Sequence, residues 1–128
     1  MDPAENGGEG SWILADTFPA TGREGAVAFV INGKAYIGSG RSLDASGNEV
    51  LYSDFYEYSP ALERGQRWQK IASLPGSGRS EAAAFVVNNR GYVGTGFSSR
   101  GGDLSDFWSY NPQSNQWAAV DSLPYDPR

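Results

Sequence analysis

The 128-residue sequence contains no cysteine and no histidine. Without cysteine there can be no disulfide, no thiolate nucleophile and no thiolate-based metal site. Without histidine the chain lacks the commonest general base and metal ligand. Most familiar catalytic arrangements are therefore missing, and the composition predicts a chain that is not an enzyme and that binds no metal or other cofactor.

Long hydrophobic runs and basic clusters are also missing. The longest apolar runs, residues 26–31 and 82–87, hold six residues each, far fewer than the roughly 20 needed to cross a bilayer. Ten basic and 15 acidic side chains give a net charge of -5, whereas nucleic-acid domains usually carry a basic face. We expect a soluble protein that binds neither membranes nor nucleic acid. No signal peptide is recognised, and the sequence does not indicate a compartment.

Glycine and aromatic residues are abundant. The chain has 17 Gly, 7 Pro, 7 Tyr, 6 Phe and 4 Trp, a composition typical of a folded domain with many turns. Residues 1–11 hold almost no large apolar groups and are expected to form a flexible lead. Residues 12–22 are expected to form a lone outer strand, which ends near Thr17, and a turn.

The rest of the chain is a twofold repeat, with one unit at residues 23–78 and the other at 79–128. Residues 12–40 match residues 68–96 at an offset of 56. The matching positions of the first copy are Trp12, Pro19, Gly22, Arg23, Ala26, Ala28, Phe29, Val30, Asn32, Tyr36, Gly38 and Gly40. Further along, the offset falls to 52 at Asp54 and to 49 at Trp68. Length changes of this kind map to loops.

Each unit shows the pattern of four short strands. Asn32-Gly33 and Asn88-Asn89 separate pairs of apolar segments, and Asn and Gly tolerate the positive φ of a tight hairpin turn. Two further segments follow in each unit, one rich in aromatic residues and one that begins at Trp68 or Trp117. The strand segments are expected at residues 25–31, 34–40, 51–59 and 67–73, and at 81–87, 90–96, 104–110 and 116–122.

This repeat resembles the kelch motif of β-propellers. The residues that carry the resemblance, and that we expect to be structural, are Tyr36, Gly38, Gly40, Tyr58 and Trp68 in the first unit and Tyr92, Gly94, Gly96, Tyr110 and Trp117 in the second. One departure is that the usual adjacent glycines appear as Gly-Ser-Gly and Gly-Thr-Gly. The resemblance implies an all-β fold in which each unit is a four-stranded antiparallel blade.

Two blades cannot close a ring, because two of their four broad faces would stay open. The resemblance implies six to eight blades, so we expect either a piece of a longer chain or an assembly of copies. Three copies would give six blades, and a homotrimer is the favoured partner arrangement. The strand at Trp12 makes nine strands where eight are needed, so either that strand or the one at Trp117 is expected to be exchanged between chains.

Arginine precedes the first strand of each unit, at Arg23 and Arg79, and Arg128 has the same phase. These side chains could bind carboxylates on the propeller rim. The preferred interpretation is structural, with each arginine paired to the repeating Asp54 or Asp106, because a residue present in every unit serves the unit.

The loops between the second and third strands differ between the units and are the better candidates for recognition. The candidate binding residues there are Arg41, Ser42, Ser98, Ser99 and Arg100. Acidic residues from Asp44 to Glu49 lack the spacing of a calcium loop. The Gly-x-Gly pairs lack the third glycine and the helix of a phosphate site.

The sequence therefore favours a non-enzymatic propeller segment that binds a protein or a glycan through its rim loops and assembles with itself. One alternative is a fragment of a sugar-acting enzyme, similar to six-bladed relatives that act on sialic acid, with Glu24, Glu57 or Glu81 as possible acids. Another is a truncated or engineered propeller chain.

Overall fold

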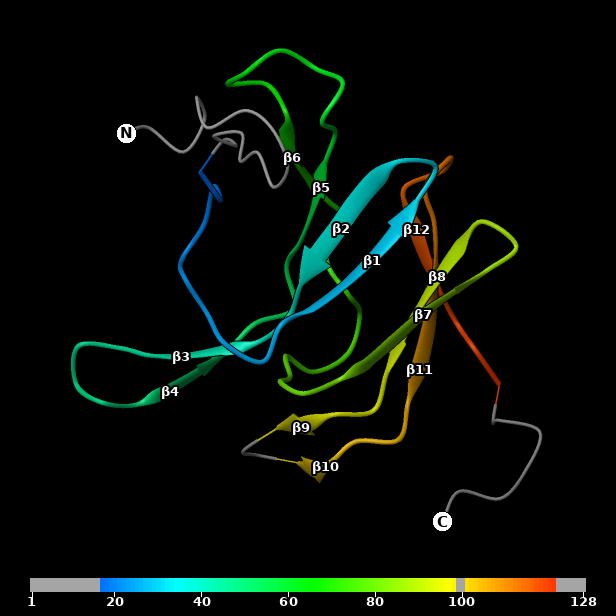
Figure 1. Ribbon diagram of the computed structural model, residues 1–128. Coiled ribbons are helices and arrows are strands. Elements are labelled where there is room, and N and C mark those ends of the chain that lie inside the picture. The colour runs from blue at the N-terminus through cyan, green and yellow to red at the C-terminus, as the bar shows by residue number, and fades with distance from the viewer. Residues whose placement is uncertain (1–16, 99–100, 122–128) are drawn as a thin grey trace, which may run out of the picture.

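The computed structural model describes residues 17–98 and 101–121 of the chain, and its core is two four-stranded antiparallel sheets (Figure 1). The first sheet has the order β1-β2-β5-β6 and the second the order β7-β8-β11-β12. The strands of the first sheet are β1 (Val27–Ile31), β2 (Lys34–Gly38), β5 (Phe55–Tyr58) and β6 (Trp68–Ile71). Those of the second sheet are β7 (Ala83–Val87), β8 (Arg90–Gly94), β11 (Phe107–Asn111) and β12 (Gln116–Ala119). The all-β class and the four strands per unit are confirmed.

Positive-φ turns produce the two tight hairpins. Asn32 and Gly33 join β1 to β2 with φ of 51° and 77°, and Asn88 and Asn89 join β7 to β8 with φ of 52° and 61°. Both central residues of a type I′ turn need this left-handed backbone, which matches the twist of the flanking strands. The hairpins lie where the sequence predicted them.

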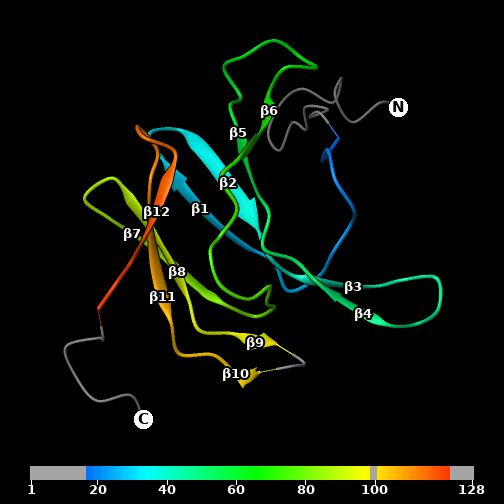
Figure 2. The same cartoon turned by 180° about the vertical axis from the view of Figure 1, so that it is seen from behind.

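Two smaller hairpins were not predicted. β3 (Arg41–Leu43) pairs with β4 (Glu49–Leu51), and β9 (Phe97–Ser98) pairs with β10 (Gly102–Asp103), in segments expected to be loops. A bridge between Glu24 and Arg41 ties the first hairpin to the segment before β1. We call β3–β4 and β9–β10 the rim hairpins; Figures 1 and 2 show them projecting from the same end of the two sheets.

Each sheet has two faces, named here by their aromatic residues. The Phe face of the first sheet carries Phe29, and the Phe face of the second carries Phe85. The opposite, Trp face carries Trp68 in the first sheet and Trp117 in the second, because side chains alternate along a strand. The Trp face of the second sheet packs on the Phe face of the first: Trp117 lies 5.1 Å from Phe55 between ring centroids.

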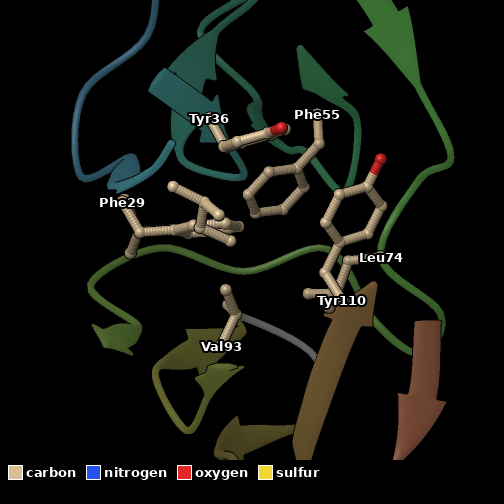
Figure 3. Packing of buried hydrophobic residues seen from close by; sticks show 8 residues of the cluster. Phe29, Tyr36, Phe55, Leu74, Val93 and Tyr110 are labelled. Atoms are coloured by element: carbon tan, nitrogen blue, oxygen red, sulfur yellow. The ribbon is translucent and has the colours of Figure 1, made fainter. Parts of the chain in front are cut away.

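The core lies between these two faces (Figure 3). Val93 and Tyr110 of the second sheet lie opposite the aromatic rings of the first, and Leu74 of the connecting segment fills the gap beside Tyr110. The buried members of the cluster are Val27, Phe29, Ile31, Tyr36, Phe55, Leu74, Val93 and Tyr110. Within residues 17–98 and 101–121 no strand pairing joins the two sheets, and side chains and a few loop hydrogen bonds hold them together.

The predicted lone strand near Trp12 begins at residues that the structure does not describe. Ser99, Arg100 and Arg128 also lie outside the described residues. The strand at Trp117 pairs with β11 of its own sheet.

Candidate functional site

Two arginine–aspartate pairs occupy the same place in the two sheets. Arg79 donates to both carboxylate oxygens of Asp106, at 2.7 and 2.8 Å, and Arg23 likewise donates to both oxygens of Asp54. The Arg23 and Arg79 side chains are 4% and 0% exposed. A buried guanidinium group whose two terminal nitrogens already donate to a carboxylate is more suited to a structural role than to ligand binding. The geometry favours the architectural interpretation of both arginines.

These pairs keep both aspartates ionised. Hydrogen bonds from Arg79 lower the pKa of Asp106 from its ordinary value despite partial burial. Burial raises the pKa of Asp54, but the hydrogen bonds from Arg23 and Tyr56 outweigh it and hold the pKa below the ordinary value. Each carboxylate is therefore committed to its arginine rather than to proton transfer.

Arg41 lies at the base of the first rim hairpin between two carboxylates. Its Nε donates to Glu49 at 2.6 Å and its Nη1 donates to Glu24. The Glu24 side chain is 71% exposed, so it is the replaceable partner of the two. An open depression of about 430 Å³ surrounds this group, lined by Gly22, Arg23, Glu24, Arg41, Ser42 and Leu43.

Glu81 has an unusual backbone next to this group. Its φ is 60°, in the left-handed region that non-glycine residues seldom adopt. The repeat places Gly25, with φ of 69°, at the equivalent position of the first unit. Glu81 N–H donates to the carbonyl of Gly25 at 2.9 Å, and Glu24 precedes that glycine. Glu24 and Glu81, both exposed, therefore lie where the chain enters β1 and β7.

The predicted binding residues are only partly brought together. Arg41 and Ser42 share the depression, where the Ser42 hydroxyl lies 2.6 Å from that of Tyr52. Ser98 is buried in β9 of the other rim hairpin. Ser99 and Arg100 fall outside the described residues.

The predicted structural residues lie in or beside the sheets. Tyr36 and Tyr110 are buried, with 5.6 Å between their ring centroids across the core, and Tyr110 packs on Trp117. On the outer side of the first sheet, Tyr58 packs on Trp68. Burial raises the pKa of Tyr110 to about 12. A Cβ at Gly38 or Gly94 would overlap a phenylalanine ring of the neighbouring strand and the backbone carbonyl of the aspartate before it. One at Gly40 or Gly96 would meet the segment entering β1 or β7. Tyr92 stacks on Phe85.

Within residues 17–98 and 101–121, no three metal-binding side chains gather to hold an ion, and no helix is long and apolar enough to cross a membrane.

The site residue that the sequence indicated least was Glu81. The sequence suggests Glu24 and Glu81 only as acids of an alternative sugar enzyme, and it does not indicate Glu49 as a partner of Arg41. A signal was present, because the repeat aligns Glu81 with a glycine. The sequence does not show that this position takes a positive φ, so the replacement of Gly25 by Glu81 in the second unit did not indicate strain.

Comparison with known proteins places the chain among propellers. No family model matches it. The chain is 25% identical to N-acetylneuraminate epimerase 1 of Escherichia coli over 94% of its own length and 40% of that protein. It is 29% identical to an F-box/kelch-repeat protein of Arabidopsis thaliana, over 82% of the chain and 27% of that protein. The solved structure of YjhT superposes with a TM-score of 0.70 at 19% identity, covering 87% of the chain and 41% of YjhT.

These findings correct one prediction. The chain was expected not to be an enzyme, and its similarity to N-acetylneuraminate epimerases contradicts that expectation. The prediction rested on missing histidine and cysteine, but carboxylates and tyrosines also transfer protons. The chain spans about two fifths or less of the relatives it matches. The two four-stranded sheets, their shared repeat and these similarities identify the chain as two blades of a kelch-type β-propeller.

Proposed function

We propose that the chain supplies two blades of a propeller that acts on a carboxylated sugar of the N-acetylneuraminate class. Two features support this: the similarity to epimerases of that sugar along nearly the whole chain, and the pair of Glu24 and Arg41 that lines an open depression. Glu81 does not line this depression, but its backbone N–H bonds to Gly25, the residue after Glu24. The rim hairpins differ between the two blades, as loops that contact a ligand usually do.

The backbone of Glu81 is the observation that carries the proposal. Glycine adopts φ near +60° without strain, whereas another L-residue pays of the order of 1 kcal/mol or more. The first blade uses Gly25 at this position, and the second keeps a glutamate. Strained positions of this kind cluster at functional sites, so the Glu81 carboxylate is assigned a role in binding or chemistry.

The chemistry follows from the residue types. Epimerisation leaves the composition of the sugar unchanged, so every proton removed must be returned, and the site needs a base and an acid. In this proposal Glu81 removes the proton as the base, and the protonated Glu81 then returns it as the acid. Arg41 binds the sugar carboxylate when the exposed Glu24 swings away, while Glu49 keeps its 2.6 Å hydrogen bond to Arg41.

Exchange between epimers of N-acetylneuraminate, followed by NMR, tests this role. Wild-type protein should accelerate exchange, and Glu81→Gln, which keeps the shape but removes the base, should lower kcat by roughly 10²-fold or more. Glu81→Gly should lose the same activity yet melt at a higher temperature, because the strain is relieved. Arg41→Ala should mainly raise KM.

Glu63→Gln is the matched control, because Glu63 is an exposed glutamate in the turn between β5 and β6, away from the rim hairpins. Equal activity of wild type, Glu81→Gln and Glu63→Gln would contradict the role of Glu81. Absence of any acceleration by the wild type would contradict the sugar-acting function.

We also propose that copies of the chain complete the ring. Two blades leave one broad face of each sheet without a neighbouring blade, and large contiguous apolar faces are rare on monomers. Three copies joined head to tail give six blades with cyclic symmetry. The mass in solution should then be about three times the 13.8 kDa of one chain.

A further inference from the structure

The Phe face of the second sheet is open, although its counterpart in the first sheet is closed. Phe29 and Ile31 on β1 are 5% and 3% exposed, whereas Phe85 and Val87, their equivalents on β7, are 43% and 47% exposed. The offset of 56 relates both pairs. The difference therefore comes from what covers each face rather than from residue type.

The open face already has the geometry of the closed one. Phe29 stacks on Tyr36 with 5.1 Å between ring centroids and 13° between planes. Phe85 stacks on Tyr92 at 5.1 Å and 6°. A third ring, Phe107, lies 5.7 Å from Phe85, and its counterpart lies 6.4 Å from Phe29. A preorganised face does not need to be ordered when a partner docks.

The same chain carries a face of the kind that covers such a surface. In the structure, Tyr110 and Trp117 of the second sheet pack on the Phe face of the first. Their equivalents, Tyr58 and Trp68, lie on the Trp face of the first sheet, where they contact each other with 4.8 Å between ring centroids. The first sheet thus has the chemistry to cover the open face of another molecule.

A cavity marks where the incoming tryptophan would lie. Trp117 packs on Phe55 and donates its indole N–H to the carbonyl of Ala72 at 2.8 Å. At the equivalent end of the second sheet there is a cavity of about 210 Å³ beside β11 and β12. Its lining includes Phe107, Val120 and Asp121, together with Trp108 and Ala119 of the Trp face, so the cavity lies at the edge of the Phe face. Phe107 and Asp121 are the repeat equivalents of Phe55 and Ala72.

We propose that the Phe face of the second sheet binds the Trp face of the first sheet of a second copy of this chain, with Trp68 of that copy in the cavity beside Phe107. This rests on the proposed assembly of copies and specifies its surface. Phe18 contacts Tyr56 and Trp68 on the Trp face of the first sheet. Its repeat equivalent is Leu74, which is buried between the two sheets of one chain. Phe18 therefore becomes part of the contact.

One position requires adjustment. Gly91 lets the Phe29 ring approach the backbone of β8, and a Cβ there would overlap that ring. The second copy presents Ala35 instead of glycine at the repeat-equivalent position, so the Phe85 ring must turn away from the Ala35 methyl group. Shortening this side chain with Ala35→Gly should tighten association.

Two single-face variants test the surface. Val87→Lys blocks the open Phe face, and Tyr58→Lys blocks the Trp face, each by placing a charge in an apolar contact. Each variant alone should sediment as a monomer. A 1:1 mixture should form a heterodimer of about twice the chain mass, because each variant retains the face that the other lacks. Leu43→Lys, an exposed leucine on the first rim hairpin, is the control and should assemble like the wild type.

Circular dichroism must show folded protein for each variant, and Phe85→Lys provides a second block of the Phe face if Val87→Lys does not fold. If the wild type is an oligomer and both lysine variants form the same oligomer, the proposed contact surface is wrong, although the proposal that copies assemble is not contradicted. A monomeric wild type would overturn assembly itself, and a mixture that stays monomeric would overturn the head-to-tail contact.

Discussion

At the scale of single residues, burial separates two kinds of arginine in this chain. Arg79 is fully buried and shares both guanidinium branches with one carboxylate, whereas Arg41 is partly exposed and is held between two glutamates. The sequence indicated the first kind, because a residue that recurs in each repeat has a recurring partner. It did not indicate that Glu24 pairs with Arg41, since 17 positions separate them.

Asp106→Asn should destabilise the protein. The substitution leaves the buried Arg79 charge without its counterion. Breaking a fully buried pair costs about 3 kcal/mol or more, and the cost here should be smaller because the Asp106 side chain is 39% exposed. Urea unfolding followed by tryptophan fluorescence measures the change. Arg41→Ala serves as the control, and its unfolding midpoint should fall less than that of Asp106→Asn, because the Arg41 side chain is 31% exposed and water can solvate its glutamate partners. Equal midpoints for Asp106→Asn and wild type would contradict the architectural role of the pair.

Stability should fall at both extremes of pH. The pKa values of Asp54 and Asp106 are lowered in the folded state, so their contribution is present above the unfolded value near 3.9 and is lost as pH falls below about 4. Burial raises the pKa values of Tyr56 and Tyr110 to about 12, so their contribution is lost as pH rises above about 10.

Between these limits the curve should be flat, because the chain has no histidine to titrate. Thermal melting measured from pH 2 to 12 would show this plateau. A steep change in melting temperature between pH 5 and 8 would contradict the assignment of these groups.

At the scale of strands and hairpins, local signals were sufficient for the two main sheets. Asn32-Gly33 and Asn88-Asn89 fix turns through their own backbone preferences, and the alternating apolar residues fix which side chains enter the core. The rim hairpins were missed because their strands are two or three residues long and contain Ser, Gly and Asp, which have low strand propensity. Pairing with the distant segments at Glu24 and Ser80 holds them in place.

Gly94→Ala should weaken the second sheet. A Cβ at this position would overlap the Phe107 ring and the backbone carbonyl of Asp106 on the adjacent strand, and forcing extra volume into a packed site costs about 1 to 3 kcal/mol. Gly22→Ala is the matched control, because a Cβ there meets nothing within 4 Å. Denaturant melts of the two variants compare them directly, and equal stability would contradict the close approach of β8 and β11.

At the scale of the whole molecule, counting broad faces was enough to predict that two blades leave surface uncovered. The sequence did not reveal which face would be open, since the twofold repeat makes both blades look alike. In the structure the Trp face of the second blade covers the Phe face of the first, and this arrangement determines which faces remain open. Among the residues that the structure describes, nothing covers the Phe face of the second blade.

The centre of the open Phe face consists of the uncharged side chains of Phe85, Val87, Tyr92 and Phe107, with Arg90 at the end of β8 beside Val87. This composition sets how any contact made there responds to temperature and salt. Burial of apolar surface gives association a negative heat-capacity change, and its driving force weakens on cooling. Screening by simple salt has little to act on at such a surface. A ring joined through this face would loosen in the cold and be nearly indifferent to moderate ionic strength.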